Sequence, residues 1–286
     1  METPDLNRKL HVYGCSFSDG GGLDAREYFT SGLKKGLIPS DWVSRVEDFL
    51  TDSTDYSFDE FKNNHRYSDI ISRKLNIDTF NYSATANNNE NIYNVAYEHI
   101  VKYPNCIHII QWSIPERKMI WIDRIRKFIN LQGINGDWTG QITKLDKFGG
   151  INKFKHMNVS IFSTNGDSSF EDIDYSKEQE NYIYWLLNNF NLDYEFNQIT
   201  KLTRLLDTFA KANNTPLYWI PWDYRGPFLD SFIDLDQKDL QTWSMDNSLQ
   251  IKHETEGEYD DSHLSLKGNY VLAEKIIEKF KEDSLL

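Results

Sequence analysis

A short and nearly continuous apolar run at residues 106–111 is the feature that most constrains the fold of this chain. It lacks the regular change between polar and apolar positions that marks a strand with one solvated face. Such a run is expected where helices cover both faces of a parallel sheet. Just before it, apolar residues recur at helical spacing from Ile92 to Ile100, after a capping-box-like start formed by Asn87 and Glu90. The run and the helix before it predict an α/β fold.

The same alternation continues along the chain. We expect strands near residues 9–14, 78–83, 106–112 and 216–222. A helix should end near residue 76, two helices broken near Asn191 should occupy residues 178–211, and a last helix should follow a cap at Ser265. This pattern predicts a three-layer α/β/α sandwich around a parallel sheet of about five strands.

Three stretches do not fit this minimal pattern, at about residues 24–64, 115–177 and 223–259. We interpret them as insertions in a single domain that spans residues 1–286, since the length allows one large α/β domain. Each follows an expected strand end or leads into the last helix. We therefore expect the insertions to lie along the carboxyl edge of the sheet, where open α/β folds bind ligands.

The charge and the apolar pattern exclude several kinds of partner. Lys and Arg number 31 against 44 Asp and Glu, a net charge of −13 that opposes binding to a phosphate backbone. No apolar stretch approaches the roughly 18 residues of a membrane span, and the N-terminal residues lack the features of a signal peptide. We expect a cytoplasmic protein that binds neither nucleic acid nor membranes. The sequence leaves its oligomeric state open.

Two short motifs at opposite ends of the chain carry residues suited to catalysis. The first, Gly14-Cys15-Ser16-Phe17-Ser18-Asp19-Gly20, follows the first expected strand, and the second, Asp260-Asp261-Ser262-His263, precedes the last helix. A serine hydroxyl becomes a useful nucleophile when a base is within hydrogen-bond reach and a third group orients that base. The alternative interpretation is structural, with a tight turn at the first motif and a helix cap at the second.

Together the two motifs resemble those of the SGNH or GDSL hydrolases. The resemblance implies Ser16 as nucleophile, His263 as base and Asp260 as the orienting carboxylate, with Asp261 as its rival. It also implies a flavodoxin-like strand order of 2-1-3-4-5. The implied reaction is hydrolysis of an ester, such as an O-acyl group on a carbohydrate or another small molecule, through an acyl-enzyme and without a cofactor.

The resemblance also implies where the oxyanion donors lie. They are the backbone N–H of Ser16, a backbone N–H after the second strand, where Ala86 replaces the usual glycine, and an Asn after the third strand. The third place departs from the family, because Gln111-Trp112-Ser113 contains no Asn. Either the Ser113 hydroxyl takes that role, or an Asn from residues 87–89 such as Asn87 does, or the third donor is absent.

Several other side chains have competing interpretations. Cys15 is a rival nucleophile, although neighbouring extended residues face opposite sides and a small residue packed under the turn is the simpler interpretation. Trp112 and Trp222 follow strands and could form a flat wall for substrate, or belong to the core. Arg117 could bind an anion or lie on the surface. His11 and His108 fall within expected strands and are interpreted as structural.

No metal site is expected. Asp19, Asp260, Asp261 and His263 could gather near one another, but the chain shows no familiar metal-ligand spacing. The main alternative to an enzyme is a non-catalytic binding or structural module that keeps the hydrolase fold. The missing Asn and the long insertions favour that alternative, while the presence of all three triad residue types favours a hydrolase.

Overall fold

The computed structural model describes part of the chain. The described residues are 9–20, 23, 63–83, 87–115, 117–122, 127–133, 159–163, 191–221, 229–251 and 263–286, with 177, 181, 185 and 189 as single positions. Four residues singled out from the sequence, Ala86, Trp222, Asp260 and Asp261, lie outside this set, as do residues 24–62 of the first expected insertion.

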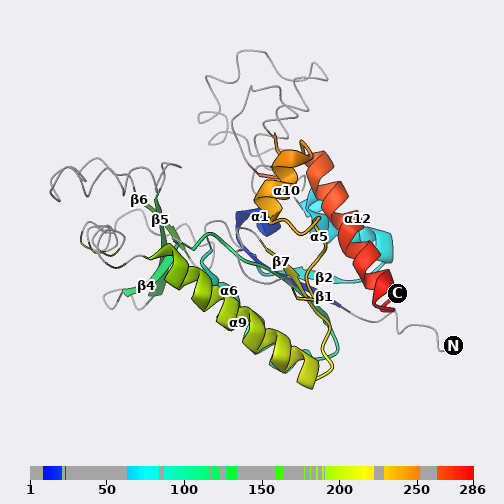
Figure 1. The fold of residues 1–286 in the computed structure, drawn as a ribbon, viewed down its shortest axis with the longest axis horizontal. Helices are drawn as coiled ribbons and strands as arrows, with labels where there is room; N and C mark the ends of the chain where they lie inside the picture. The colour runs from blue at the N-terminus through cyan, green and yellow to red at the C-terminus, as the bar shows by residue number, and fades with distance from the viewer. Residues whose placement is uncertain are drawn as a thin grey trace, which may run out of the picture.

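The centre of the fold is a parallel sheet with the order β2-β1-β3-β7 (Figure 1). Its strands are β1 (Leu10–Tyr13), β2 (Thr79–Asn81), β3 (Ile107–Gln111) and β7 (Leu217–Ile220). These are the four strands expected from the sequence, in the order expected for a flavodoxin-like sheet. Beyond β7, Phe232 forms a single isolated parallel bridge with Trp219, so the described residues form four strands of this sheet where the sequence predicted about five.

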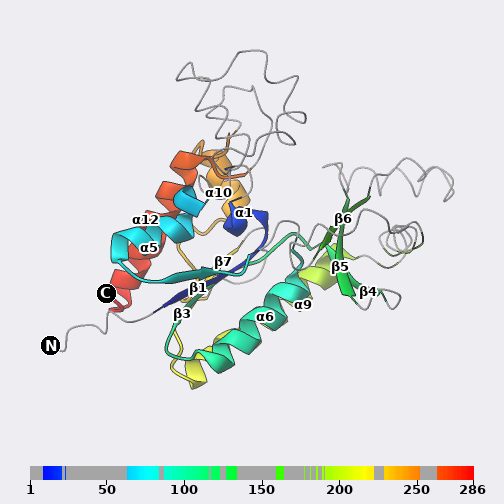
Figure 2. The same ribbon diagram turned by 180° about the vertical axis from the view of Figure 1, so that it is seen from behind.

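Helices cover both faces of this sheet, as Figures 1 and 2 show. On one face lie α5 (Tyr67–Leu75), α10 (Leu240–Asp246) and α12 (Leu266–Glu282). On the other lie α6 (Asn89–Lys102) and α9 (Leu192–Ala212). The protein therefore has the three-layer α/β/α arrangement that the sequence predicts.

The central strands bury alternate residues on opposite faces. Leu10 and Val12 pack with α5 and α12, whereas Tyr13 packs with α6 and α9. In β3, Ile109 belongs to the first cluster and Ile110 to the second. The side chains on both faces of these strands are buried, which explains the nearly continuous apolar run in the sequence.

Polar side chains cap the starts of α6, α9, α10 and α12. The Asn191 side chain accepts from Tyr194 N at the start of α9, and the Ser265 side chain accepts from Gly268 N at the start of α12. Both positions agree with the sequence expectations. The start of α6 differs, because Asn88, one residue after Asn87, caps the helix. Asn87 is engaged elsewhere, as described below.

Residues 229–251, within the third expected insertion, contribute to the main core. Ile233, Leu235, Leu240, Trp243 and Leu249 are all buried in the cluster between the sheet and α12. The backbone N–H of Leu240 donates to Pro221 O, directly after β7. This segment is therefore part of the packed sandwich rather than only an addition at its edge.

The second expected insertion contains an antiparallel sheet that the sequence analysis did not anticipate. Its strands are β4 (Lys118–Ile122), β5 (Lys127–Gly133) and β6 (Val159–Ser163), in the order β4-β5-β6. It lies near the starting ends of α6 and α9 (Figures 1 and 2). In the described part of the chain, no helix has both the length and the apolar character that crossing a membrane requires.

Candidate active site

Ser16 is the first residue of α1 (Ser16–Asp19), a short helix directly after β1. The turn before it is tight, because the backbone N–H groups of Ser18 and Asp19 both donate to Cys15 O, at 3.1 and 2.9 Å. A side chain at Gly14 would place its Cβ 2.6 Å from Ser18 Oγ, closer than real contacts allow. Glycine is thus needed here for close packing. The backbone N–H of Ser16 has no hydrogen-bond partner among the described residues, which leaves it available as a donor.

His263 lies beside Ser16. Its Nε2 atom is 2.8 Å from Ser16 Oγ, within hydrogen-bond distance, and Ser16 is buried. The Phe17 ring stacks on the imidazole, with 4.4 Å between the ring centroids. The structure therefore brings together the two residues that the sequence analysis assigned as nucleophile and base.

Residues 263–265, which include His263, are held against residues 249–251 of the core. The His263 carbonyl accepts from Ile251 N at 3.0 Å, and the next residue, Leu264, pairs with Gln250. Ser265 N then donates to Leu249 O at 2.9 Å. These backbone contacts fix the position of the His263 backbone beside the serine turn. Asp260 and Asp261 lie outside the described residues, so the choice of orienting carboxylate stays a prediction.

Cys15 faces away from this pair. Its side chain is 1% exposed and belongs to the core cluster on the α12 side of the sheet. The thiol donates to Gln111 Oε1 at 3.3 Å. This geometry matches a small residue packed under the turn and argues against the rival interpretation of Cys15 as nucleophile.

Gln111, the last residue of β3, supports the turn from below. Its Oε1 lies 3.3 Å from both Cys15 N and Cys15 Sγ and 3.2 Å from Ser18 Oγ, and all three can donate to it. Its amide nitrogen donates to Trp112 O. Ser18 Oγ also lies 2.6 Å from the Tyr67 hydroxyl, which ties the turn to α5. The sequence analysis missed this role, although a buried glutamine at the end of an apolar strand is an available signal.

Two asparagines connect the loops that follow β1, β2 and β3. Asn87 Nδ2 donates to Gly14 O at 3.1 Å. Asn89 forms two bonds with the backbone of Ser113, accepting from its N–H at 2.6 Å and donating to its carbonyl at 3.0 Å. The three loops at the carboxyl edge therefore form one hydrogen-bonded unit around the serine turn.

Of the expected oxyanion donors, Ser16, Asn87 and Ser113 are among the described residues. Ala86 lies outside the described residues. Asn87 uses one amide proton on Gly14, and its Oδ1 accepts from Asn88 N and Asn91 Nδ2. The Ser113 hydroxyl accepts from Arg117 Nη1 at 2.8 Å. Asn87 and Ser113 thus have clear structural partners, and their catalytic role stays a prediction.

Arg117 and Trp112 are both engaged in contacts inside the protein. Arg117 is half-buried and its Nη1 donates to Ser113 Oγ and to Asn87 O, so it is not a free surface arginine. Trp112 is 2% exposed, stacks on Trp219 and donates to Thr203 Oγ1 at 2.8 Å. It is a core residue, which corrects its assignment to a substrate wall. Trp222, the other residue assigned to that wall, lies outside the described residues.

A separate buried cluster of aromatic and histidine rings packs against β1 and β3. His108 is hydrogen-bonded, since its ring nitrogens lie 3.0 Å from the Tyr13 hydroxyl and from Tyr103 O. His11 is also a buried structural residue, but neither of its ring nitrogens has a hydrogen-bond partner among the described residues. Burial lowers the pKa of His11 and of His108 to about 4.

The described residues contain no group of three or more His, Cys, Asp or Glu side chains that could hold a metal ion. Asp260 and Asp261 fall outside that search, so the alternative metal site that includes them is untested. What the described residues do form is a hydrogen-bonded pair between Ser16, on a short helix after β1, and His263, from the segment before α12. The protein is therefore an α/β/α sandwich with a candidate hydrolytic site.

Comparisons with known proteins add little to the assignment of the site. No family model matches the sequence, and no curated protein matches it significantly. Among solved structures, the chain is similar to "Structure of a putative lipolytic protein of G-D-S-L family from Desulfitobacterium hafniense DCB-2", at 11% identity over 96% of this chain and 99% of that chain. The TM-score is 0.33, too low to support an argument about function.

Proposed function

We propose that the protein is a serine hydrolase of the SGNH type that cleaves an acyl ester through an acyl-enzyme. The observation that carries this proposal is the 2.8 Å distance between Ser16 Oγ and His263 Nε2. A candidate general base must lie within about 2.6–3.2 Å of the proton that it removes, and this pair meets that requirement without any movement.

The reaction proceeds in two halves. His263 Nε2 takes the hydroxyl proton as Ser16 Oγ attacks the ester carbonyl, and the resulting imidazolium gives that proton to the departing alcohol. Water then attacks the acyl-serine while His263 takes its proton; the bond from the acyl carbon to Ser16 Oγ breaks, the carboxylic acid leaves, and the imidazolium returns the proton to Ser16 Oγ. The N–H groups of Ser16 and Ala86 hold the negative oxygen of each intermediate, and Asp260 orients the imidazole. These steps require no cofactor. The substrate is an O-acyl ester of a small molecule or glycan.

The second candidate is a binding or structural module that keeps the fold without turnover. The observation that favours it is the absence of an Asn after β3, where Ser113 already has Arg117 as a partner. Against it stands the geometry of the serine turn. Gly14, Gln111 and Asn87 all hold the turn in place under a serine whose hydroxyl meets an imidazole nitrogen.

Labelling with a fluorophosphonate probe separates these two functions. An activated serine attacks the phosphorus, the P–F bond breaks, fluoride leaves and the base takes the proton. We expect a stable adduct that mass spectrometry maps to Ser16. The His263→Ala variant should label at least about 100-fold more slowly, because general-base catalysis is worth that much. As a histidine control, His65→Ala should label at the wild-type rate. An unlabelled folded protein, or an adduct on another residue, would rule out the hydrolase.

A further inference from the structure

Asn269, near the start of α12, has a buried side chain that makes three hydrogen bonds. Its Oδ1 accepts from the backbone N–H of Tyr67 at 3.0 Å, and its Nδ2 donates to Leu264 O at 3.2 Å and to Ser265 O at 3.0 Å. A backbone N–H can only donate and a carbonyl can only accept, so these partners fix which way the amide points. The bond to Ser265 lies within the first turn of α12, whereas the other two reach beyond that helix.

The bond to Tyr67 gives α5 a helix cap that its own sequence lacks. The first N–H groups of a helix have no partner inside the helix, and a Ser, Thr, Asp or Asn just before the helix usually satisfies one of them. Arg66 stands at the cap position of α5, and its side chain makes no capping bond. Asn269 supplies the acceptor instead, from 202 residues away. The start of α5 is therefore fixed by α12.

The start of α5 in turn contacts α1, the helix that carries the nucleophile. The Tyr67 hydroxyl lies 2.6 Å from Ser18 Oγ, and burial raises the pKa of Tyr67, so the hydroxyl keeps its proton and can donate it. Ser68 Oγ accepts from Asn81 Nδ2, which also donates to Ser18 O at 2.7 Å. Ser18 and Ser16 belong to the same short helix. The first two residues of α5 are thus both connected to the helix of the nucleophile.

The other long-reaching bond of Asn269 holds the residue that follows the base. Leu264 comes directly after His263, and its carbonyl accepts from Asn269 Nδ2. The start of α12 has little room to move here, because a Cβ at Gly268 would overlap Leu249 O. The same Leu249 carbonyl accepts from the backbone N–H and from the hydroxyl of the serine that caps α12. Asn269 and Leu249 thus hold the segment that carries the imidazole.

From these contacts we infer that Asn269 is a positioning residue for the catalytic base. One amide group binds both the segment that carries His263 and the start of α5, which holds the helix of Ser16. Its three partners do not include the reacting atoms, so it acts by keeping Ser16 Oγ and His263 Nε2 within hydrogen-bond distance. A shift of about 1 Å in a reacting group can cost about 100-fold in rate. This inference rests on the proposed function where it concerns turnover.

The rate at which the fluorophosphonate probe labels Ser16 measures this role. Asn269→Leu keeps a similar volume and removes all three side-chain bonds. We expect it to slow labelling about tenfold, because it removes part of the contribution of a general base, which is about 100-fold or more. In the His263→Ala background the same change should alter the rate by less than about twofold, since the base that Asn269 positions is gone. All rates are compared at a temperature at which thermal unfolding shows every variant to be folded.

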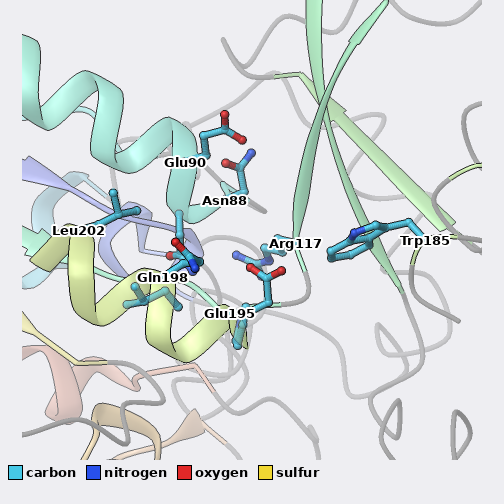
Figure 3. A pocket seen from close by; sticks show the side chains of 10 residues that line it. Asn88, Glu90, Arg117, Trp185, Glu195, Gln198 and Leu202 are labelled. Carbon is cyan, nitrogen blue, oxygen red and sulfur yellow. The ribbon is translucent and has the colours of Figure 1, made fainter. Parts of the chain in front are cut away.

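A control variant is available on the opposite face of the sheet. The Gln198 side chain lines the cavity between the starts of α6 and α9 (Figure 3). Gln198→Leu makes the same kind of change, from an amide to leucine, on the face of the sheet away from α12. It should leave the labelling rate within about twofold of the wild-type rate, as expected for an independent site.

Asn269→Asp carries the test if the leucine variant does not fold. Its carboxylate keeps the acceptor for Tyr67 N but, when ionised, has no proton to give to the Leu264 and Ser265 carbonyls. It should therefore loosen the His263 side alone and slow labelling only where His263 is present. Failure of both variants to fold would assign Asn269 to the stability of the sandwich and would overturn the positioning role.

The contact between the two catalytic residues can also be followed without any chemistry. In protein with isotopically labelled histidine, the NMR signals of the His263 ring are identified by their absence in His263→Ala. Ser16→Ala should shift these signals in the native background. In the Asn269→Leu background the shift should be about half as large or less, because a hydrogen bond weakens steeply as its geometry degrades.

The outcomes distinguish this inference from the proposed function. A folded wild-type protein that takes no label rules out the hydrolase, while the NMR comparison still supports or overturns the positioning role. Equal slowing by Asn269→Leu with and without His263 overturns that role and leaves the hydrolase standing, because the effect then does not pass through the base. An undiminished NMR shift from Ser16→Ala, or equal slowing by Gln198→Leu, overturns it as well.

Discussion

The imidazole of His263 meets the hydroxyl of Ser16 across 247 residues of sequence, at 2.8 Å. Ser16 is placed by the end of β1, and His263 by the segment that pairs with Gln250 just before α12. Each residue is thus fixed by a different part of the core. Their contact follows from the packing of the whole sandwich.

Replacement of the nucleophile should separate chemistry from stability. Ser16→Ala is expected to abolish acyl-ester turnover and leave the melting temperature nearly unchanged, because it removes one hydroxyl and little packing. Ester hydrolysis and thermal unfolding of the purified variant measure the two effects. Cys15→Ser is the matched control and should retain turnover, since Cys15 faces Gln111. Loss of activity in the cysteine variant alone would assign the nucleophile to Cys15.

The orienting carboxylate can be identified by two single changes. Asp260→Asn should lower turnover greatly, by as much as about 10⁴ as in the serine-protease template, because an amide cannot fix the same imidazole tautomer. Asp261→Asn should have far less effect, since it lies only two residues from His263. Kinetics on any ester that the wild type cleaves will decide between them. A larger loss from Asp261→Asn would reverse the assignment.

Gln111 should act as a positioning residue for the serine turn. Gln111→Leu keeps the volume but leaves Cys15 N and Ser18 Oγ without this acceptor, at about 1–3 kcal/mol of unfolding free energy for a buried unpaired group. We expect kcat to fall more than tenfold, with a smaller change in KM. Thr203→Val removes a buried hydrogen bond to Trp112 elsewhere in the core and should lower stability without that loss of kcat. Equal effects of the two variants on kcat would refute a specific role for Gln111.

Acid should destabilise the fold through the buried histidine cluster. The pKa of His11 and of His108 is lowered from 6.5 to about 4, first by burial, so the folded protein favours their neutral forms. Their contribution to stability is therefore complete above pH 6.5 and is lost as the pH falls from 6.5 toward 4. Urea unfolding at several pH values measures it. His11→Leu should flatten the dependence in this window, whereas a change at His65, outside the cluster, should not. An unchanged slope in His11→Leu would exclude His11 as a source.

Local sequence patterns were enough to predict the main strands and helices of the fold. The apolar run of β3 indicated burial on both faces, and the signals at Asn191 and Ser265 located two helix starts. The Ser16 and His263 motifs fell at expected ends of elements. All of these depend on neighbours within a few residues of sequence, which is the range over which helix caps and strand patterns act.

The residues that surround and support the Ser–His pair could not be predicted from local patterns, because their partners are distant in the sequence. Gln111 reaches Cys15 across 96 residues, and its role depends on the register between β1 and β3. The direction of Trp112 depends on where β3 ends, and one residue of difference moves a side chain to the other face of the sheet. Arg117 looked like a surface residue because its partners, Asn87 and Ser113, come from two separate loops.

The position of His263 next to α12 also has a consequence during translation. Residues 10–220 supply the four described strands β1, β2, β3 and β7 of the parallel sheet before the ribosome has made the histidine. The Ser16 turn can therefore form on a nascent chain that still lacks its base. α12 must then pack against α5 to hold the His263 segment in place. If the proposed hydrolase activity depends on this Ser–His contact, it can begin only once α12 has docked.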